Sequence, residues 1–260
     1  MNGTTHPFHA GLSFGPLCLD VADLPRASAF YTGVLGLDVL AATSDETLLG
    51  AGGEPLARLR ARPDAGAPPP RAAGLFHVAF LVPTRTDLSA ALRRLVGAGV
   101  PVGSADHLVS EAIYISDPEG NGIEIYRDRP ADEWPRRADG RPRIATLALD
   151  PGILELATRE AGLPPGTIIG HVHLKVNDLD EAVGFYRHAL GLDVIARLPG
   201  AAFLGADGYH HHVGLNTWES AGGDPPPAGA RGLAGLTARR AGGADADLVD
   251  PTGLPLQISA

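Results

Sequence analysis

The sequence predicts an α+β protein built from four βαβββ modules, arranged as two duplicated halves. The main observation is an internal repeat: residues 23–39 and 178–194 align without gaps, and ten of the seventeen positions are identical. A weaker repeat relates DPEGNGIEIY, which begins at Asp117, to DPTGLPLQIS, which begins at Asp250. Because self-similarity at a fixed spacing is the signature of repeated structural units, we divide the chain into four modules.

Each module is expected to open with a strand and to continue with a helix and further short strands. In the third module, residues 171–176 alternate in character, as a half-buried strand does. Apolar side chains then recur at helical spacing over 179–190, after Asn177 or Asp178, either of which suits an N-cap. Gly191 suits the left-handed position that ends a helix.

The second module follows the same plan, with a strand over 76–82, a helix over 86–97 and a hairpin turn over 117–122. The fourth module is shorter by about the length of that helix. We therefore expect it to complete a sheet without a helix of its own. The modules assign residues 1–130 to a first domain, residues 131–166 to a linker with a short helix, and residues 167–260 to a second domain.

Composition excludes several classes of protein. The chain has 260 residues, 44% of them hydrophobic, which is enough for two domains. A net charge of −9 and a pI of about 5.5 argue against nucleic acid and anionic membrane surfaces as partners. One cysteine, Cys18, excludes an intramolecular disulfide and a cysteine-rich metal site. The N-terminus lacks a secretory signal pattern and no apolar run is long enough to span a membrane, so we expect a soluble, cytoplasmic protein.

Histidines are concentrated in the third module. GHVHLKV places His171 and His173 on its first strand, and YHHHVGLNTW places His210, His211 and His212 on a later predicted strand. Strand alternation puts His210 and His212 on one face and His211 on the other. Such a cluster is a metal site, a set of core histidines or a surface run, and the residue pattern alone leaves these alternatives open.

Several long motifs carry a resemblance to a known family. The segments GLFHVAFLVPTR, DHLVSEAIYISDPEGNGIEIYRDRP, IGHVHLKVNDL and GYHHHVGLNTW resemble the vicinal oxygen chelate superfamily of glyoxalases and extradiol dioxygenases, and in particular two-domain catechol-2,3-dioxygenase-like proteins. The resemblance covers nearly the whole chain and is weakest over the fourth module. It implies a glyoxalase/dihydroxybiphenyl dioxygenase-like fold, in which the strands curl into open β-cups. It also implies an extradiol ring-cleaving dioxygenase that inserts O₂ into a catechol-type vicinal diol.

The resemblance also implies a set of metal ligands. In the superfamily, one module supplies a ligand from its first strand, and its partner supplies one from its first and one from its last strand. Here those positions are His171 in module three, and His77 and Glu124 in module two. They imply a non-haem Fe(II) site, with Mn(II) as the alternative, in a cup formed by modules two and three. The equivalent positions of modules one and four hold poor ligands: Pro16, Gly235 and Gln257.

Residues around the metal follow from the same resemblance. Extradiol enzymes use a nearby histidine for proton transfer and a tyrosine as a hydrogen-bond group. His212, which leads into the apolar VGL, is expected to be the acid–base group, and Tyr114 the tyrosine. His107, His210 and Asn216 are expected to line the substrate pocket.

Other interpretations stay open at this point. Taken one at a time, the candidates also fit ordinary roles. His77 fits a core histidine, and Glu124 fits a solvent-facing residue of an alternating strand. The triple histidine fits a solvated turn or an adventitious metal binder. The same fold also serves glyoxalase-like metal-dependent isomerases or lyases and non-catalytic, drug-sequestering proteins. The expected partners are a small aromatic diol and O₂. Edge strands in this fold could also pair between chains, which would form a homo-oligomer.

Overall fold

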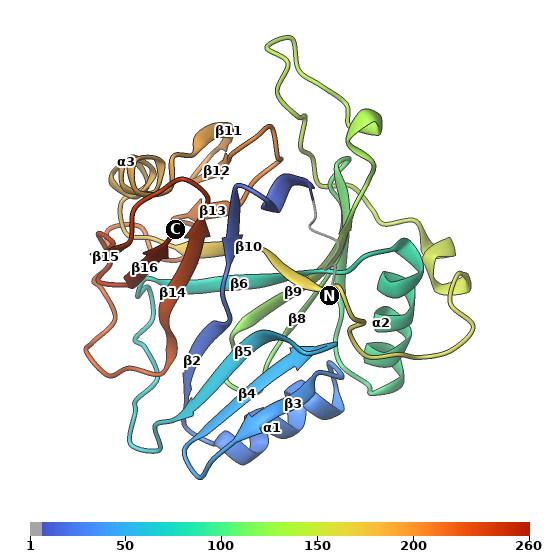
Figure 1. Cartoon of the computed structure of the whole chain (residues 1–260), viewed down its shortest axis with the longest axis horizontal. Coiled ribbons are helices and arrows are strands. Elements are labelled where there is room, and N and C mark those ends of the chain that lie inside the picture. Colours follow the sequence, from blue (N-terminus) through green and yellow to red (C-terminus); the bar gives the residue numbers. More distant parts are fainter. Residues whose placement is uncertain (1–6) are drawn as a thin grey trace.

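The computed structural model describes residues 7–260, which form an α+β fold with two eight-stranded sheets and three α-helices (Figure 1). Residues 1–6, part of the segment in which no secretory signal is predicted, lie outside the described residues. The first sheet contains β1 (Leu12–Phe14), β2 (Leu17–Val21), β3 (Asp38–Ala42), β4 (Glu46–Ala51), β5 (Glu54–Ala61), β14 (Gly232–Arg240), β15 (Ala246–Val249) and β16 (Pro255–Ser259). The second contains β6 (Gly74–Leu81), β7 (Gly103–Asp106), β8 (Ser110–Ser116), β9 (Gly122–Asp128), β10 (Ile168–Lys175), β11 (Asp193–Leu198), β12 (Ala201–Gly205) and β13 (Val213–Asn216).

Each sheet joins modules from both halves of the sequence. In the first sheet, β14 of module four pairs with β2 of module one; in the second, β10 of module three pairs with β6 of module two. The predicted pairing of modules two and three is therefore confirmed. The strand order of the second sheet is β11-β12-β13-β10-β6-β9-β8-β7, so β6 lies between β10 and β9. The division of the chain at residues 130 and 166 stays a prediction.

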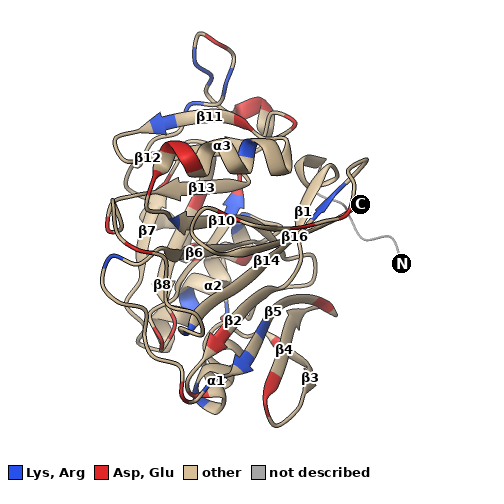
Figure 2. Cartoon of the chain, turned by 90° about the vertical axis from the view of Figure 1, so that its left-hand side faces the viewer, with Lys and Arg blue, Asp and Glu red and all other residues tan. Residues whose placement is uncertain are grey.

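The helices pack against the sheets that their own modules form. Helix α1 (Leu24–Gly33) contacts β4 and β5, α2 (Arg85–Gly97) contacts β9, and α3 (Leu179–Leu190) contacts β12 and β13 (Figure 1). Between β14 and β16 the described chain has only β15, which confirms the expected loss of the fourth helix. No helix within residues 7–260 is long and apolar enough to cross a bilayer. In Figure 2, basic and acidic residues are interspersed along the ribbon of both sheets.

The ends of α3 follow the predicted chemistry. Asp178 is the N-cap, and its side chain accepts a hydrogen bond from the Glu181 N–H. Asn177 instead donates to the carbonyl oxygen of Ser220. At the other end, Gly191 has φ 64° and ψ 38°, the left-handed conformation that glycine adopts without steric cost.

The repeated residues form two equivalent buried contacts. The Tyr31 hydroxyl on α1 donates to Asp117 Oδ2 at 3.2 Å, and the Tyr186 hydroxyl on α3 donates to Asp250 Oδ2 at 2.8 Å. Burial first, and the adjacent carboxylate second, raise the pKa of both tyrosines well above the usual value, so both keep the donated proton. Each contact fastens a helix to the turn of the following module, so this part of the repeat has a structural role.

The helix predicted in the linker is a single 3₁₀ turn, η3 (Pro151–Glu155), capped by Asp150. It lies on α2, where Ser89 Oγ donates to the Ile153 carbonyl and accepts from the Ala157 N–H.

Candidate metal centre

Three side chains that the sequence places far apart meet on one face of the second sheet. Oε2 of Glu124 on β9 lies 2.9 Å from Nε2 of His77 on β6 and 3.1 Å from Nε2 of His171 on β10. The three ligand atoms all lie within 4.8 Å of one another, and all three residues are buried. The structure thus brings together the three residues predicted as metal ligands.

Strand register explains how these side chains reach each other. Ala79 on β6 is the pairing partner of Glu124 on β9 and of His171 on β10. Its short side chain is fully buried and leaves space above β6 for its longer neighbours. His77 lies two residues earlier on β6, which places it on the same face of the sheet.

An irregularity in β10 sets the position of His171. The register with β6 shifts between Ile169 and His171, so Gly170 is an additional residue on this strand. A Cβ atom on Gly170 would lie 1.8 Å from the hydroxyl oxygen of Tyr126. Because Gly170 has no side chain, the Tyr126 ring can pack with its centroid 4.8 Å from that of His171.

The charge state of the cluster suits a cation. Burial acts to raise the pKa of Glu124, but His171 and His77 outweigh it and hold this pKa well below the usual value. Burial also lowers the pKa of His171, and Glu124 offsets this only in part. The lowered pKa of Glu124 and the lowered pKa of His171 conflict. The first relies on a charged His171, whereas the second makes His171 neutral, and a neutral imidazole stabilises the carboxylate less than an imidazolium does. We conclude that burial keeps His171 neutral and Glu124 ionised, which leaves a buried negative charge that requires compensation.

The donor atoms fit a divalent metal ion. Although Nε2 of His77 is close to Glu124, it is not aligned for a hydrogen bond, and within residues 7–260 it is buried without a hydrogen-bond partner. Two imidazoles and one carboxylate form a set that suits divalent first-row transition metals. These residues could therefore hold such an ion.

A third histidine lies beside the cluster but is already engaged. The ring centroid of His173 is 4.8 Å from that of His77. Its Nε2 accepts a hydrogen bond from Nδ2 of Asn216 at 3.0 Å, and burial lowers the pKa of His173 well below the usual value. Asn216, predicted to line the pocket, thus reaches the cluster through His173.

The three consecutive histidines do not lie on a strand, and this part of the prediction is wrong. Strand β13 begins only at Val213, and the backbone bends at His210 and His212. Simple alternation therefore does not apply. The His211 ring packs against His171 with 4.1 Å between centroids. The structure brings His211, rather than the expected His212, into contact with the cluster.

Backbone groups occupy both ring nitrogens of His212. Nε2 lies 3.0 Å from the carbonyl oxygen of Phe8 and so donates to it, whereas Nδ1 accepts from the Ala206 N–H at 3.2 Å. Burial lowers the pKa of His212 to about 4. A proton added at Nδ1 would point at the Ala206 N–H, which gives a local reason for this shift.

Tyr114 and His107 form a hydrogen-bonded pair next to the cluster. Tyr114 pairs with Glu124 across β8 and β9, and its ring centroid is 5.6 Å from that of His77. Nδ1 of His107 lies 2.7 Å from the Ala145 carbonyl oxygen and therefore donates, so its Nε2 accepts the Tyr114 hydroxyl proton at 2.7 Å. Burial, and then Glu124, raise the pKa of Tyr114 well above the usual value.

Two polar residues of the site were not predicted. Tyr126 and Asp128 follow Glu124 at alternate positions of β9, which places all three on one face of the strand. The Tyr126 hydroxyl lies 2.7 Å from that of Tyr209, and Asp128 Oδ1 lies 2.8 Å from Nε2 of His210. The same period-two alternation, counted onward from Glu124, could have identified both.

Aromatic side chains surround His173 at one side of the cluster. The ring centroids of Phe76, Phe203 and Trp218 lie 5.0, 5.7 and 5.8 Å from that of His173. Trp218 is 51% exposed, so this wall extends from the buried cluster to the surface.

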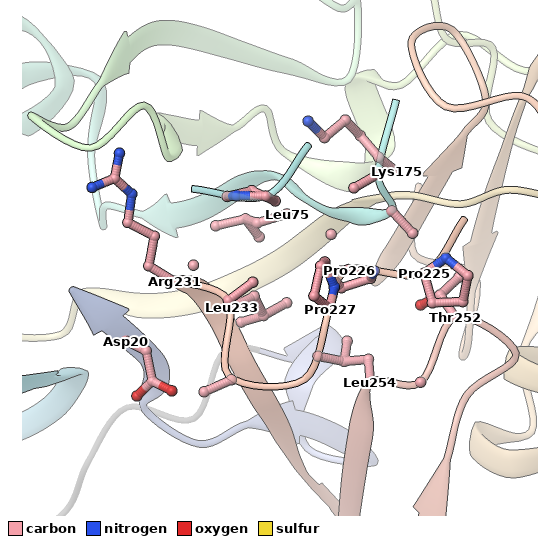
Figure 3. A pocket seen from close by; sticks show the side chains of 18 of the residues that line it. Asp20, Leu75, Lys175, Pro225, Pro226, Pro227, Arg231, Leu233, Thr252 and Leu254 are labelled. Carbon is pink, nitrogen blue, oxygen red and sulfur yellow. The ribbon is translucent and has the colours of Figure 1, made fainter. Parts of the chain in front are cut away.

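A cavity of about 820 Å³ lies elsewhere, lined by residues of both sheets and two proline-rich loops (Figure 3). None of the three predicted ligands lines it. Three of its basic side chains pair with acidic residues that also line it: Arg60 with Asp20, Arg231 with Glu119, and Lys175 with Glu219. The fourth basic residue of the cavity, Arg71, donates to the carbonyl oxygen of Ala221. We locate the chemistry at the histidine cluster, because the three predicted ligands meet there.

Comparison with known proteins agrees with this geometry. The sequence profile of the Glyoxalase/Bleomycin resistance protein/Dioxygenase superfamily matches residues 13–125 and 168–241. A protein named catechol-2,3-dioxygenase from Bacillus subtilis (strain 168) is 44% identical over 232 residues, which cover 86% of this chain and 81% of the relative.

Solved structures show the same fold. A putative dioxygenase from Bacillus subtilis subsp. subtilis str. 168 superposes with a TM-score of 0.62 at 14% identity, over 95% of this chain and 84% of the other. Glyoxalase I from Zea mays superposes with a TM-score of 0.56 at 16% identity, over 97% and 94%. The duplicated modules, the profile match and the identity to the Bacillus relative together show that the chain belongs to the Glyoxalase/Bleomycin resistance protein/Dioxygenase superfamily.

Proposed function

We propose that this protein is an extradiol ring-cleaving dioxygenase that inserts O₂ into a catechol-type vicinal diol at a non-haem Fe(II) site. The observation that carries the proposal is the buried cluster of His77, Glu124 and His171 on one face of the second sheet. The 44% identity to a protein named catechol-2,3-dioxygenase supports the same reaction class.

His77, Glu124 and His171 would hold the metal through two imidazole nitrogens and one carboxylate oxygen. When bound there, Fe(II), or Mn(II) as the alternative, would supply the binding and activation of the diol and of O₂. Glu124 contributes the negative charge that offsets part of the charge of the ion, and the buried position of all three excludes bulk water.

His211 is the residue that we assign to proton transfer, in place of His212. Burial, and then the neighbouring histidines, lower the pKa of His211 well below the usual value, so the ring is neutral at pH 7. A neutral imidazole can accept a diol proton at its nitrogen and return it later in the reaction. His211 is 9% exposed, whereas His210 and His212 are fully buried, so His211 is the most accessible of the three.

Tyr114 is assigned as a hydrogen-bond donor to oxygen at the site. Its raised pKa keeps the hydroxyl protonated. The hydroxyl proton can turn from His107 toward a bound oxygen by rotation about the C–O bond. His107 thereby acts through Tyr114, as Asn216 acts through His173.

The aromatic wall formed by Phe76, Phe203 and Trp218 supports an aromatic substrate. Flat apolar rings at the exposed side of the cluster favour a planar ligand, because aromatic pairs gain energy beyond the area that they bury. This wall is where substituents on the diol ring would be discriminated.

The test is a turnover assay with defined metal content. The protein is reconstituted with Fe(II) under anaerobic conditions, and O₂ and a panel of catechols are then added. We expect a yellow ring-fission product with one O₂ consumed per diol. Glu124→Gln should abolish it, whereas His188→Gln, at an exposed position of α3, should not. Absence of both product and oxygen uptake across the panel, with the metal bound, would contradict the proposal.

A further inference from the structure

Three buried side chains form a hydrogen-bonded chain that ends at the proposed proton-transfer residue. Asp128 Oδ1 lies 2.8 Å from Nε2 of His210. Nδ1 of His210 lies 2.8 Å from Nδ1 of His211. The His210 side chain is fully buried and that of Asp128 is 8% exposed, so solvent does not compete for these contacts.

The chemistry of the three groups fixes the direction of each hydrogen bond. A carboxylate oxygen accepts from an imidazole N–H, so Nε2 of His210 donates to Asp128. In the tautomer of His210 that has its proton on Nε2, Nδ1 has a lone pair and accepts. Nδ1 of His211 is therefore the donor, and the lone pair of His211 is on Nε2.

This arrangement leaves Nε2 as the working atom of His211. The His211 ring packs against that of His171, and its centroid lies 5.0 Å from the centroid of the Phe203 ring. Nδ1 is committed to His210, so only Nε2 is available at the cluster. Without the hydrogen bonds from Asp128 through His210, both neutral tautomers of His211 would be populated. The tautomer with its proton on Nε2 cannot accept another proton at that atom.

We propose that Asp128 and His210 are positioning residues that hold His211 in the Nδ1–H tautomer, with the lone pair of Nε2 presented to the diol. The inference rests on the proposed function for its catalytic consequence, whereas the tautomer itself is independent of any activity. It also gives the adjacent histidines different tasks: His210 orients and His211 reacts.

The first test reads the tautomer directly. The full-length chain is labelled with ¹⁵N-histidine, and two-bond ¹H–¹⁵N correlation spectra are recorded; the signals of His211 are assigned by their loss in His211→Gln. We expect the Nδ1–H pattern for His211 in the wild type. His210→Gln, whose amide can still donate to position 128 and accept from His211, should preserve that pattern. His210→Leu should give the Nε2–H pattern or a mixture.

A second variant covers the case in which His210→Leu does not fold. In Asp128→Leu position 128 can no longer accept from Nε2 of His210, so the His210 proton is free to move to Nδ1 and donate to His211. His211 should then again lose its pure Nδ1–H pattern. An Nε2–H pattern for His211 in the wild type would overturn the proposal. So would an Nδ1–H pattern that survives in a folded His210→Leu or Asp128→Leu variant.

The catalytic consequence is measured on the Fe(II)-loaded protein with a catechol. We expect kcat to fall by about 10²-fold or more in His210→Leu, while KM for the diol stays within about twofold, and His210→Gln should recover most of kcat. Equal losses in both His210 variants would overturn the positioning role. If the wild type shows no ring cleavage at all, the proposed function fails, and the tautomer spectra still decide the structural part of the inference.

Discussion

Glu124 Oε2 lies 3.1 Å from His171 Nε2, although the two residues belong to different halves of the duplicated sequence. Strand β6 separates the strands that carry them, and Ala79 pairs with both residues. The cluster is therefore a product of the sheet that joins modules two and three. No local motif creates it, and its integrity depends on the packing of that sheet.

Removal of the carboxylate should remove the metal. In Glu124→Gln the site loses its only anionic ligand, so we expect the affinity for Fe(II) to fall by more than the roughly 10–100-fold typical of changes outside the ligand set. Metal content after desalting, measured by atomic emission, tests this. The matched control is Glu181→Gln at an exposed position of α3. Equal metal content in wild type and Glu124→Gln would exclude Glu124 as a ligand.

The space above Ala79 should be needed for metal binding. Ala79→Leu would place a bulky side chain between Glu124 and His171, costing about 1–3 kcal/mol of stability through overpacking. Ala57→Leu is the control, because Ala57 is equally buried on β5 of the other sheet. We expect both variants to be destabilised in urea and only Ala79→Leu to lose metal. Full metal content in a folded Ala79→Leu variant would show that the gap has no role.

Gly170 should tolerate no side chain. Because a Cβ there would lie 1.8 Å from the Tyr126 hydroxyl oxygen, Gly170→Ala must displace Tyr126 or the strand, at a cost of about 1–3 kcal/mol. At Gly184 on α3 a Cβ meets nothing within 4 Å, and Gly184→Ala should stabilise by about 0.5–1 kcal/mol. Denaturant unfolding of both variants measures the difference, and a neutral Gly170→Ala would contradict this view of the bulge.

His212 should make stability depend on pH. Its pKa is about 4 in the folded protein and about 6.5 when unfolded, so in this window the unfolded chain binds more protons. Stability is complete above about pH 6.5 and falls as pH decreases toward 4, by at most about 3 kcal/mol from this group. His212→Gln should reduce the difference in unfolding free energy between pH 7 and pH 4.5, whereas the exposed His188→Gln should not. An unchanged difference in His212→Gln would show that His212 does not stay neutral.

Substitutions of His211 and His212 should have different effects on kcat. We expect His211→Gln to lower kcat by about 10²–10⁴-fold, as loss of a general acid–base group does. His212→Gln should retain kcat at pH 7.5 within a few-fold wherever it folds. Steady-state rates at saturating diol, normalised to bound metal, test this contrast. A larger loss in folded His212→Gln than in His211→Gln would restore the assignment that the sequence favours.

The sequence predicts the fold from its internal repeat and the metal cluster from a resemblance to a known family. The repeat around Tyr31 and Tyr186 reveals the modules, and the first-strand and last-strand positions that serve as ligands in the vicinal oxygen chelate superfamily correspond to His77, Glu124 and His171. The roles of His210, His211 and His212 could not be predicted in this way. They depend on bends before β13, which break the alternation assumed for a strand, and on partners from distant segments, such as Asp128 and Phe8.

The most direct test of the central claim is diffraction from crystals grown anaerobically with Fe(II), with data collected on both sides of the iron absorption edge. The account predicts one strong anomalous peak per chain, bonded to Nε2 of His77, Nε2 of His171 and a carboxylate oxygen of Glu124. An iron peak at any other position, or a fully loaded protein without iron at these three residues, would contradict it.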